Sequence, residues 1–155
     1  MTEVSFYHLQ QTRLEDVLPL LLEKTLSAGK RALVMTASNV RSEHLGQALW
    51  RNQKDSWLPH GCKKDGRSED QPIWLTHVEE NPNKANFIFL TDGTARVDLD
   101  GFERCFELFD GHDGAQVTAA RERWKTYKGL GFQLKYFQQT ENGGWQEKAS
   151  SLGPI

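Results

Sequence analysis

Hydrophobic and polar positions along the chain follow two periods, one typical of strands and one typical of helices. Short apolar runs rich in β-branched and aromatic residues predict strands at residues 4–9, 32–35, 73–78, 85–90 and 132–137. Apolar residues three and four apart predict amphipathic helices at residues 12–28, 40–50 and 115–130. Because strands alternate with helices, we expect an α/β fold: a single-domain three-layer sandwich with a mostly parallel sheet.

Three segments lack this periodicity. Residues 51–72 hold nine charges in 22 residues, which predicts a long solvated loop. Residues 92–114 are expected to mix a short helix with another strand. The stretch that begins at Thr140 is rich in glycine and serine, which is typical of a flexible C-terminal tail. The sequence therefore predicts a folded domain at residues 1–139 and a flexible tail at residues 140–155.

Composition narrows the class of protein. The chain has 155 residues, which suits one domain, and its formal net charge of −2 gives no chain-wide basic field for nucleic acid or anionic lipid. The two cysteines, Cys62 and Cys105, have no metal-like spacing and define no disulfide framework. No apolar stretch is long enough to span a bilayer, and no secretion signal is recognised. We expect a cytoplasmic protein.

Motifs for catalysis and cofactor binding are missing from the sequence. The string Ser27–Arg31 resembles a phosphate loop but lacks its first glycine and its Ser or Thr. The five histidines do not have the spacing of a metal site, and no nucleophile motif is found. We therefore predict no catalytic residue, metal or cofactor. Asp92, directly after the apolar run 85–90, leaves one alternative open: an uncharacterised enzyme on a nucleotide-type α/β fold.

The predicted helix at residues 115–130 is the most informative feature. At 100° per residue, one face collects Arg121, Trp124, Lys125 and Lys128. Residues 115–130 carry four bases and one acid, whereas residues 92–114 carry seven acids and two bases. Two interpretations of this basic face remain open. It is either a solvated surface with a half-buried tryptophan or a binding site for an acidic partner. Direct binding of nucleic acid is disfavoured by the neighbouring acidic segment.

Several short motifs occur in an order that is more specific than any one of them. They are Phe6–Leu9, Gly29–Arg31, Ala48–Trp50, Ser56–His60, Phe106–Asp110, Arg121–Lys128 and Gly131–Phe132. Over residues 3–137, this order resembles the chi subunit family of bacterial DNA polymerase III. The resemblance implies a nucleotide-binding-like fold without its phosphate loop, and a non-catalytic connector in the clamp-loader complex.

The resemblance also implies two binding surfaces. The acidic C-terminal tail of the single-stranded DNA-binding protein would bind Arg121, Trp124 and Lys125, with Trp50 nearby, and helix geometry adds Lys128. Contact with the psi subunit is implied for Trp57 and its neighbours Pro59 and His60. DNA would then be contacted only indirectly. Such a tail needs a cation for its terminal carboxylate, further cations for its acids and an apolar slot, and the basic helix offers this set.

Overall fold

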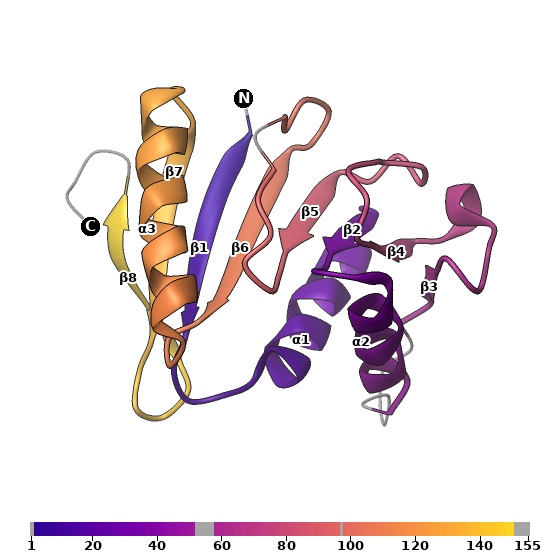
Figure 1. Ribbon diagram of the computed structural model, residues 1–155, viewed down its shortest axis with the longest axis horizontal. Coiled ribbons are helices and arrows are strands. Elements are labelled where there is room, and N and C mark those ends of the chain that lie inside the picture. Colours follow the sequence, from indigo (N-terminus) through magenta and orange to yellow (C-terminus); the bar gives the residue numbers. More distant parts are fainter. Residues whose placement is uncertain (1, 52–57, 97, 151–155) are drawn as a thin grey trace.

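A computed structural model of the protein describes residues 2–51, 58–96 and 98–150, and these form one sheet with helices on both faces (Figure 1). Three α-helices are α1 (Leu14–Ser27), α2 (Asn39–Arg51) and α3 (Gly114–Gly129), and η1 (Ser68–Asp70) is a short 3-10 helix. The strands are β1 (Glu3–Leu9), β2 (Ala32–Met35), β3 (Gly61–Cys62), β4 (Ile73–Thr76), β5 (Phe87–Leu90), β6 (Arg104–Asp110), β7 (Gln133–Gln139) and β8 (Trp145–Ser150).

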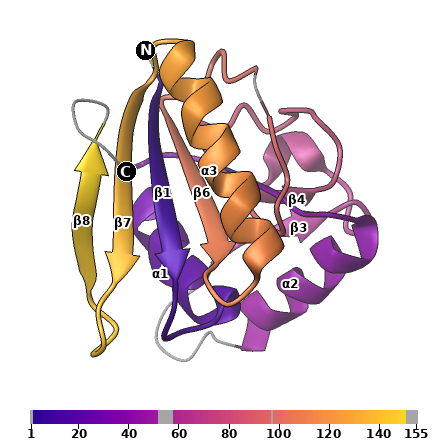
Figure 2. The same cartoon turned by 60° about the vertical axis from the view of Figure 1, so that its left-hand side comes forward.

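The sheet has the order β3-β4-β2-β5-β6-β1-β7-β8, and all neighbours are parallel except β7 and β8. One core cluster lies under α1 and α2 and includes Leu18, Leu45 and Phe106. The other lies under α3 and includes Phe6 and Trp124. Figure 2 shows α3 in front of the sheet and α1 behind it. The predicted three-layer sandwich with a mostly parallel sheet is confirmed.

The sequence explains where α3 begins and which of its faces is buried. Its N-cap is Asp113, whose carboxylate accepts hydrogen bonds from the backbone N–H groups of Ala115 and Gln116 at 3.0 and 3.3 Å. Ala120, Trp124 and Tyr127 are its buried residues, at the i, i+4, i+7 spacing that places side chains on one helix face. This face packs on the strands, whereas Arg121, Lys125 and Lys128 are exposed on the outer side of the helix.

A buried polar cluster fastens α3 to β6. Glu107 is 1% exposed, and its Oε2 accepts a hydrogen bond from Arg123 Nε at 2.9 Å. The Tyr127 hydroxyl lies 3.1 Å from the same oxygen and 2.9 Å from the carbonyl oxygen of Arg96. Burial, the largest cause, raises the pKa of Glu107 to about 7, although Arg123 and the Tyr127 hydrogen bond lower it.

The structure differs from the predicted C-terminal tail. Residues Trp145–Ser150 form β8, which pairs antiparallel with β7. Gly143 has a φ of +86° in the connecting turn, and the Trp145 ring packs edge-on against Tyr7 with centroids 5.0 Å apart. Asn142-Gly143 is a favoured hairpin pair. This turn and the contact between Trp145 and Tyr7 allow a strand to form despite the polar composition of the segment. Within the segment predicted as a flexible tail, residues 145–150 thus form a strand of the sheet.

Two loops also differ from expectation. Residues 51–72 contain the two-residue edge strand β3 and η1. Among the described residues of 92–114, β6 is the predicted strand, but the predicted short helix is not found. No helix in the described ranges combines the length and the apolar character needed to cross a membrane.

Candidate functional site

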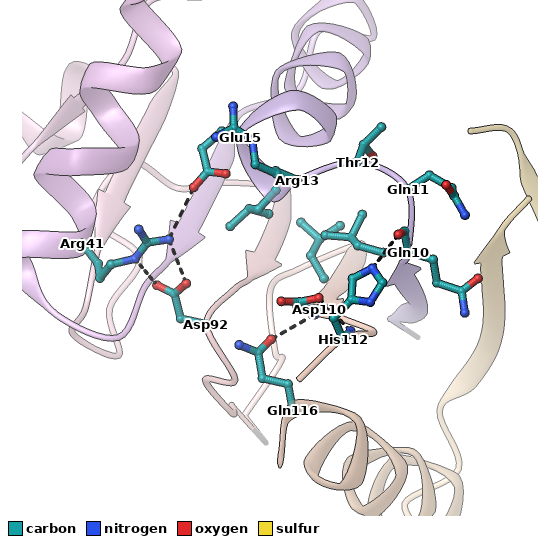
Figure 3. A pocket seen from close by; sticks show the side chains of 13 residues that line it. Gln10, Gln11, Thr12, Arg13, Glu15, Arg41, Asp92, Asp110, His112 and Gln116 are labelled. Atoms are coloured by element: carbon teal, nitrogen blue, oxygen red, sulfur yellow. Dashed lines mark hydrogen bonds and ion pairs between the residues drawn. The ribbon is translucent and has the colours of Figure 1, made fainter. Parts of the chain in front are cut away.

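The first candidate site is a cavity of about 420 Å³ at the carboxyl ends of β1, β5 and β6 (Figure 3). Here the chain leaves β1 for α1 on one face of the sheet and leaves β6 for α3 on the other. Parallel α/β sheets bind ligands at such a topological switch point. The polar lining includes Gln10, Gln11, Thr12, Arg13, Glu15, Arg41, Asp92, Asp110, His112 and Gln116.

The turn after β1 is already filled by a side chain of the protein. The N–H groups of Gln10, Gln11 and Thr12 all donate to Gln139 Oε1, at 3.1, 2.8 and 3.2 Å. Gln139 Nε2 donates in turn to Thr12 Oγ1 at 2.8 Å. Converging N–H groups at this turn hold phosphate in nucleotide-binding folds. Here an amide oxygen takes that position, so the turn does not offer a phosphate site.

Asp92 at the end of β5 is also engaged. Its two carboxylate oxygens accept hydrogen bonds from Arg41 Nε at 3.1 Å and Arg41 Nη2 at 3.0 Å. Oδ2 also accepts from the backbone N–H of Ala37 at 3.2 Å. This bidentate pair ties the start of α2 to β5. Within the described ranges, no group of three metal-ligating side chains is found. The geometry thus gives no support to Asp92 as a catalytic or metal-binding residue.

A second cavity, of about 500 Å³, lies between α3 and strands β1, β6, β7 and β8. We call it the aromatic groove, and its lining residues are Phe6, His8, Phe109, Val117, Ala120, Arg121, Tyr136, Gln138 and Lys148. Aromatic and apolar side chains predominate, and Arg121 and Lys148 are its two basic residues. The groove therefore combines an apolar surface with positive charge, as the predicted tail site requires.

The groove lining is uncharged apart from these two cations. The His8 ring is hydrogen-bonded through Nδ1 to the Tyr136 hydroxyl. Burial, followed by the charge of Arg121, lowers the pKa of His8, so His8 is neutral at pH 7. Burial raises the pKa of Tyr136, so its hydroxyl is neutral too. Arg121 forms no ion pair or side-chain hydrogen bond with the described residues, which leaves its donors available to a ligand.

The residues predicted as a binding site on α3 differ in their exposure to solvent. Arg121, Lys125 and Lys128 are exposed, and Lys125 lies 3.6 Å from Glu122 in a surface ion pair. Trp124 is only 2% exposed, and its ring packs edge-on against Phe6 with centroids 5.4 Å apart. The ring is therefore not presented at the surface of the free protein, and its contact with a bound peptide stays a prediction. The indole supports the helix from beneath, because its position matches the buried face of α3.

Trp50 does not lie near this groove. It is 49% exposed on α2, whose buried residues belong to the opposite core cluster from those of α3. Its ring centroid is 4.4 Å from that of His60. The predicted proximity of Trp50 to Arg121 is wrong, because α2 and α3 cover opposite faces of the sheet.

Trp50 instead joins the predicted partner-subunit residues. His60 is 8% exposed, with Nδ1 2.6 Å from the Leu58 carbonyl oxygen and Nε2 2.9 Å from that of Gly46. Pro59 beside it is half-buried. His60 thus anchors the segment to α2 and is largely buried, and its role as a contact residue stays a prediction. Trp57 lies outside the described residues, so its role stays a prediction.

Residues of the groove that sequence reasoning missed come from strands. Phe6, His8 and Tyr136 were assigned to strands without a functional role, Gln138 followed the last predicted strand, and Lys148 was assigned to the tail. Their alternation along β1 and β7 was a usable signal, since every second residue of a strand shares one face. Alternation alone does not say which of the two faces lies under α3, because that depends on the order of the strands in the sheet.

Comparisons with known proteins agree with this fold. The family model described as "DNA polymerase III chi subunit, HolC" matches residues 1–135. A "Probable DNA polymerase III subunit chi" of Rickettsia prowazekii (strain Madrid E) is 28% identical over 94 residues, 61% of this chain and 57% of the relative's length. The DNA polymerase III subunit chi of Escherichia coli (strain K12) is 25% identical over 108 residues, 69% of this chain and 73% of the relative.

The chain thus spans 57% of the length of the Rickettsia relative that it matches. The family is that of an accessory subunit of DNA polymerase III and not of a catalytic one. The family match covers β1 to the start of β7, and it leaves β8 outside. Since the match extends over most of the chain, this protein belongs to the DNA polymerase III chi subunit family.

Proposed function

We propose that this protein links the clamp-loader complex to the single-stranded DNA-binding protein, by binding the acidic C-terminal tail of that protein in the aromatic groove. The observation that carries this proposal is the exposed Arg121, which has no ion pair or side-chain hydrogen bond with the described residues, in a groove lined mainly by apolar and neutral side chains. The protein acts in the cytoplasm and performs no reaction itself. Its contact with DNA is made through the protein that coats the strand.

The chemistry of the groove suits such a tail. Arg121 offers a planar set of donors that pairs with a carboxylate, and the apolar lining accepts an aromatic terminal residue. Lys125 and Lys128 lie outward on α3, where they attract the acids of the tail through solvent. Filling of the turn after β1 by Gln139 favours this function over the alternative of a nucleotide-dependent enzyme.

The affinity for the tail should depend on Arg121 far more than on Lys128. We expect Arg121→Ala to weaken binding by about 2–3 kcal/mol, because a charge-assisted bond in a partly dry groove is lost. Lys128→Ala should cost less than about 1 kcal/mol, since exposed charges are screened by solvent. Calorimetric titration of the tail peptide into each variant measures both effects.

Arg51→Ala is the matched control, because Arg51 is equally exposed but lies at the end of α2, on the opposite face of the sheet. It should bind the peptide like the wild type. A peptide that lacks its last residue should bind weakly to every variant. Equal affinities across all these titrations would leave α3 as no more than a solvated basic face.

Trp57, together with its sequence neighbours Pro59 and His60, is proposed to contact the psi subunit. We expect Trp57→Ala to weaken the complex with psi by about 2–4 kcal/mol, as buried aromatic anchors of interfaces do. Its melting temperature should stay close to that of the wild type. Co-purification and titration with psi measure the first effect, and thermal unfolding measures the second. Unfolding of the isolated variant would instead show that Trp57 belongs to the core.

A further inference from the structure

Strand β8 lies beyond the residues matched by the family model, yet it contributes to the aromatic groove. We infer that Lys148 on β8 binds a second carboxylate of the acidic peptide, so that the β7–β8 hairpin completes the site. This inference rests on the proposed function of the groove. It adds a specificity residue that the family match does not include.

A β-bulge places Lys148 in the lining. Phe137 pairs with Glu147, and the preceding residue, Tyr136, pairs with Ala149, so the register shifts by one at this point. Lys148 is therefore the extra residue of β8, opposite neither partner. Such a bulge changes the direction of a side chain and interrupts strict alternation. In this case Lys148 lines the same groove as Tyr136 and Gln138.

The hairpin that carries Lys148 is fixed to the rest of the fold. The Trp145 ring packs against Tyr7, while Gln139 at the other side of the turn bonds to the segment after β1. Within the turn, the Thr140 N–H donates to the carbonyl oxygen of Gly144 at 2.8 Å. Lys148 is thus presented from an ordered strand, which lowers the entropic cost of its pairing with a ligand.

Two cations border the aromatic groove. Arg121 comes from α3 and Lys148 comes from β8, two elements that border the groove. Neither side chain has an ion pair or hydrogen bond with the residues that the structure describes. Because burial lowers the pKa of His8, and the lining contains no Asp or Glu among the described residues, these two cations have no acidic side chain in the groove to balance them. A ligand with two carboxylates and an apolar group matches this pattern better than a singly charged one.

The occupant is therefore an acidic peptide with a free C-terminus. Arg121, with its planar guanidinium, takes the terminal carboxylate. Lys148 takes the side-chain carboxylate of an acidic residue that precedes the apolar end, because a flexible ammonium accepts variable geometry. The peptide would lie between α3 and β8, with its terminal ring against the apolar lining.

The test uses the full chain and a fluorescent peptide that carries several aspartates and ends in phenylalanine. We expect Lys148→Gln to raise the Kd by about three- to tenfold at about 0.1 M salt, and Lys148→Glu to raise it further. Lys24→Gln is the matched control, since Lys24 is exposed on α1 on the other face of the sheet. Its Kd should equal that of the wild type.

A second peptide, with asparagine in place of each aspartate, distinguishes the contribution of Lys148 to binding from that of Arg121. For this peptide, Lys148→Gln should bind like the wild type, whereas Arg121→Ala should still bind more weakly. If Lys148→Gln binds the acidic peptide as tightly as the wild type does, the inference is wrong and the proposed function stands. If the wild type binds neither peptide, both are wrong. Circular dichroism confirms that each variant is folded.

Discussion

Trp124→Ala is expected to destabilise the protein by about 3–5 kcal/mol, the range for removal of a large aromatic side chain from a core. The indole is 2% exposed, and its ring packs edge-on against Phe6 and Tyr136, with centroids 5.4 and 6.2 Å away. Its removal leaves a cavity between α3 and the sheet and loosens the helix that carries Arg121. Urea unfolding followed by circular dichroism measures the loss.

Trp50→Ala is the control for this prediction, because the same residue type is 49% exposed on α2. We expect a clearly smaller loss, since only about half of this indole is buried and its removal leaves no enclosed cavity. Trp124→Phe should recover part of the stability by refilling the space. Should Trp124→Ala keep the wild-type stability and lose only peptide binding, the indole would be a ligand contact and its structural role would be refuted.

The stability of the protein should fall as the pH rises through about 7, and Glu107 is the cause. Burial raises the pKa of this carboxyl from its ordinary 4.5 to about 7 in the folded protein, so the native state binds its proton more tightly than the unfolded chain does. The stabilisation is complete below pH 4.5 and is lost as the pH rises through the folded pKa. The expected change is about 3 kcal/mol.

The hydrogen bonds around Glu107 agree with a protonated form. The Tyr127 hydroxyl lies within bonding distance of both Glu107 Oε2 and the Arg96 carbonyl oxygen, but it has only one proton to donate. A protonated Glu107 can donate a hydrogen bond to the Tyr127 oxygen. The Tyr127 hydroxyl then donates its own proton to the carbonyl oxygen of Arg96. Ionisation removes that donor from a site that is 1% exposed to solvent.

Glu107→Gln provides the matched comparison, because glutamine keeps an acceptor for Arg123 and does not ionise. Unfolding free energies of both proteins are measured in urea from about pH 5 to about pH 8. The wild type should lose stability relative to the variant as the pH rises. Parallel curves for the two proteins would show that Glu107 has the same pKa in the folded and unfolded states.

Most of the fold was predictable from local sequence. The apolar runs located β1, β2, β4, β5 and β7, and helical spacing located α1, α2 and α3, because these signals are local. β8 was missed because Asn142-Gly143 was counted as part of a flexible composition and not as a hairpin turn. Trp145 then supplied the long-range contact with Tyr7 that no local pattern reveals.

The candidate site was predictable in part. Helical spacing correctly placed Arg121, Lys125 and Lys128 on the exposed side of α3. It failed for Trp124, although the spacing of Ala120, Trp124 and Tyr127 already marks a buried stripe. The position of Trp50 could not be predicted in this way, since the faces covered by α2 and α3 depend on the strand order. Lys148 depends on a bulge, which the sequence does not specify.

The central place of β1 in the sheet has a consequence for synthesis of the chain. Glu3 pairs with Arg104 on one side and with Gln133 on the other, so both neighbours of β1 in the sheet are translated long after β1. While β2 and β4 are being translated, the apolar face of β1 remains without its neighbours in the sheet. Closing such long loops slows folding, and an exposed strand edge favours aggregation. A nascent chain that stalls before β6 would therefore need a chaperone to cover β1.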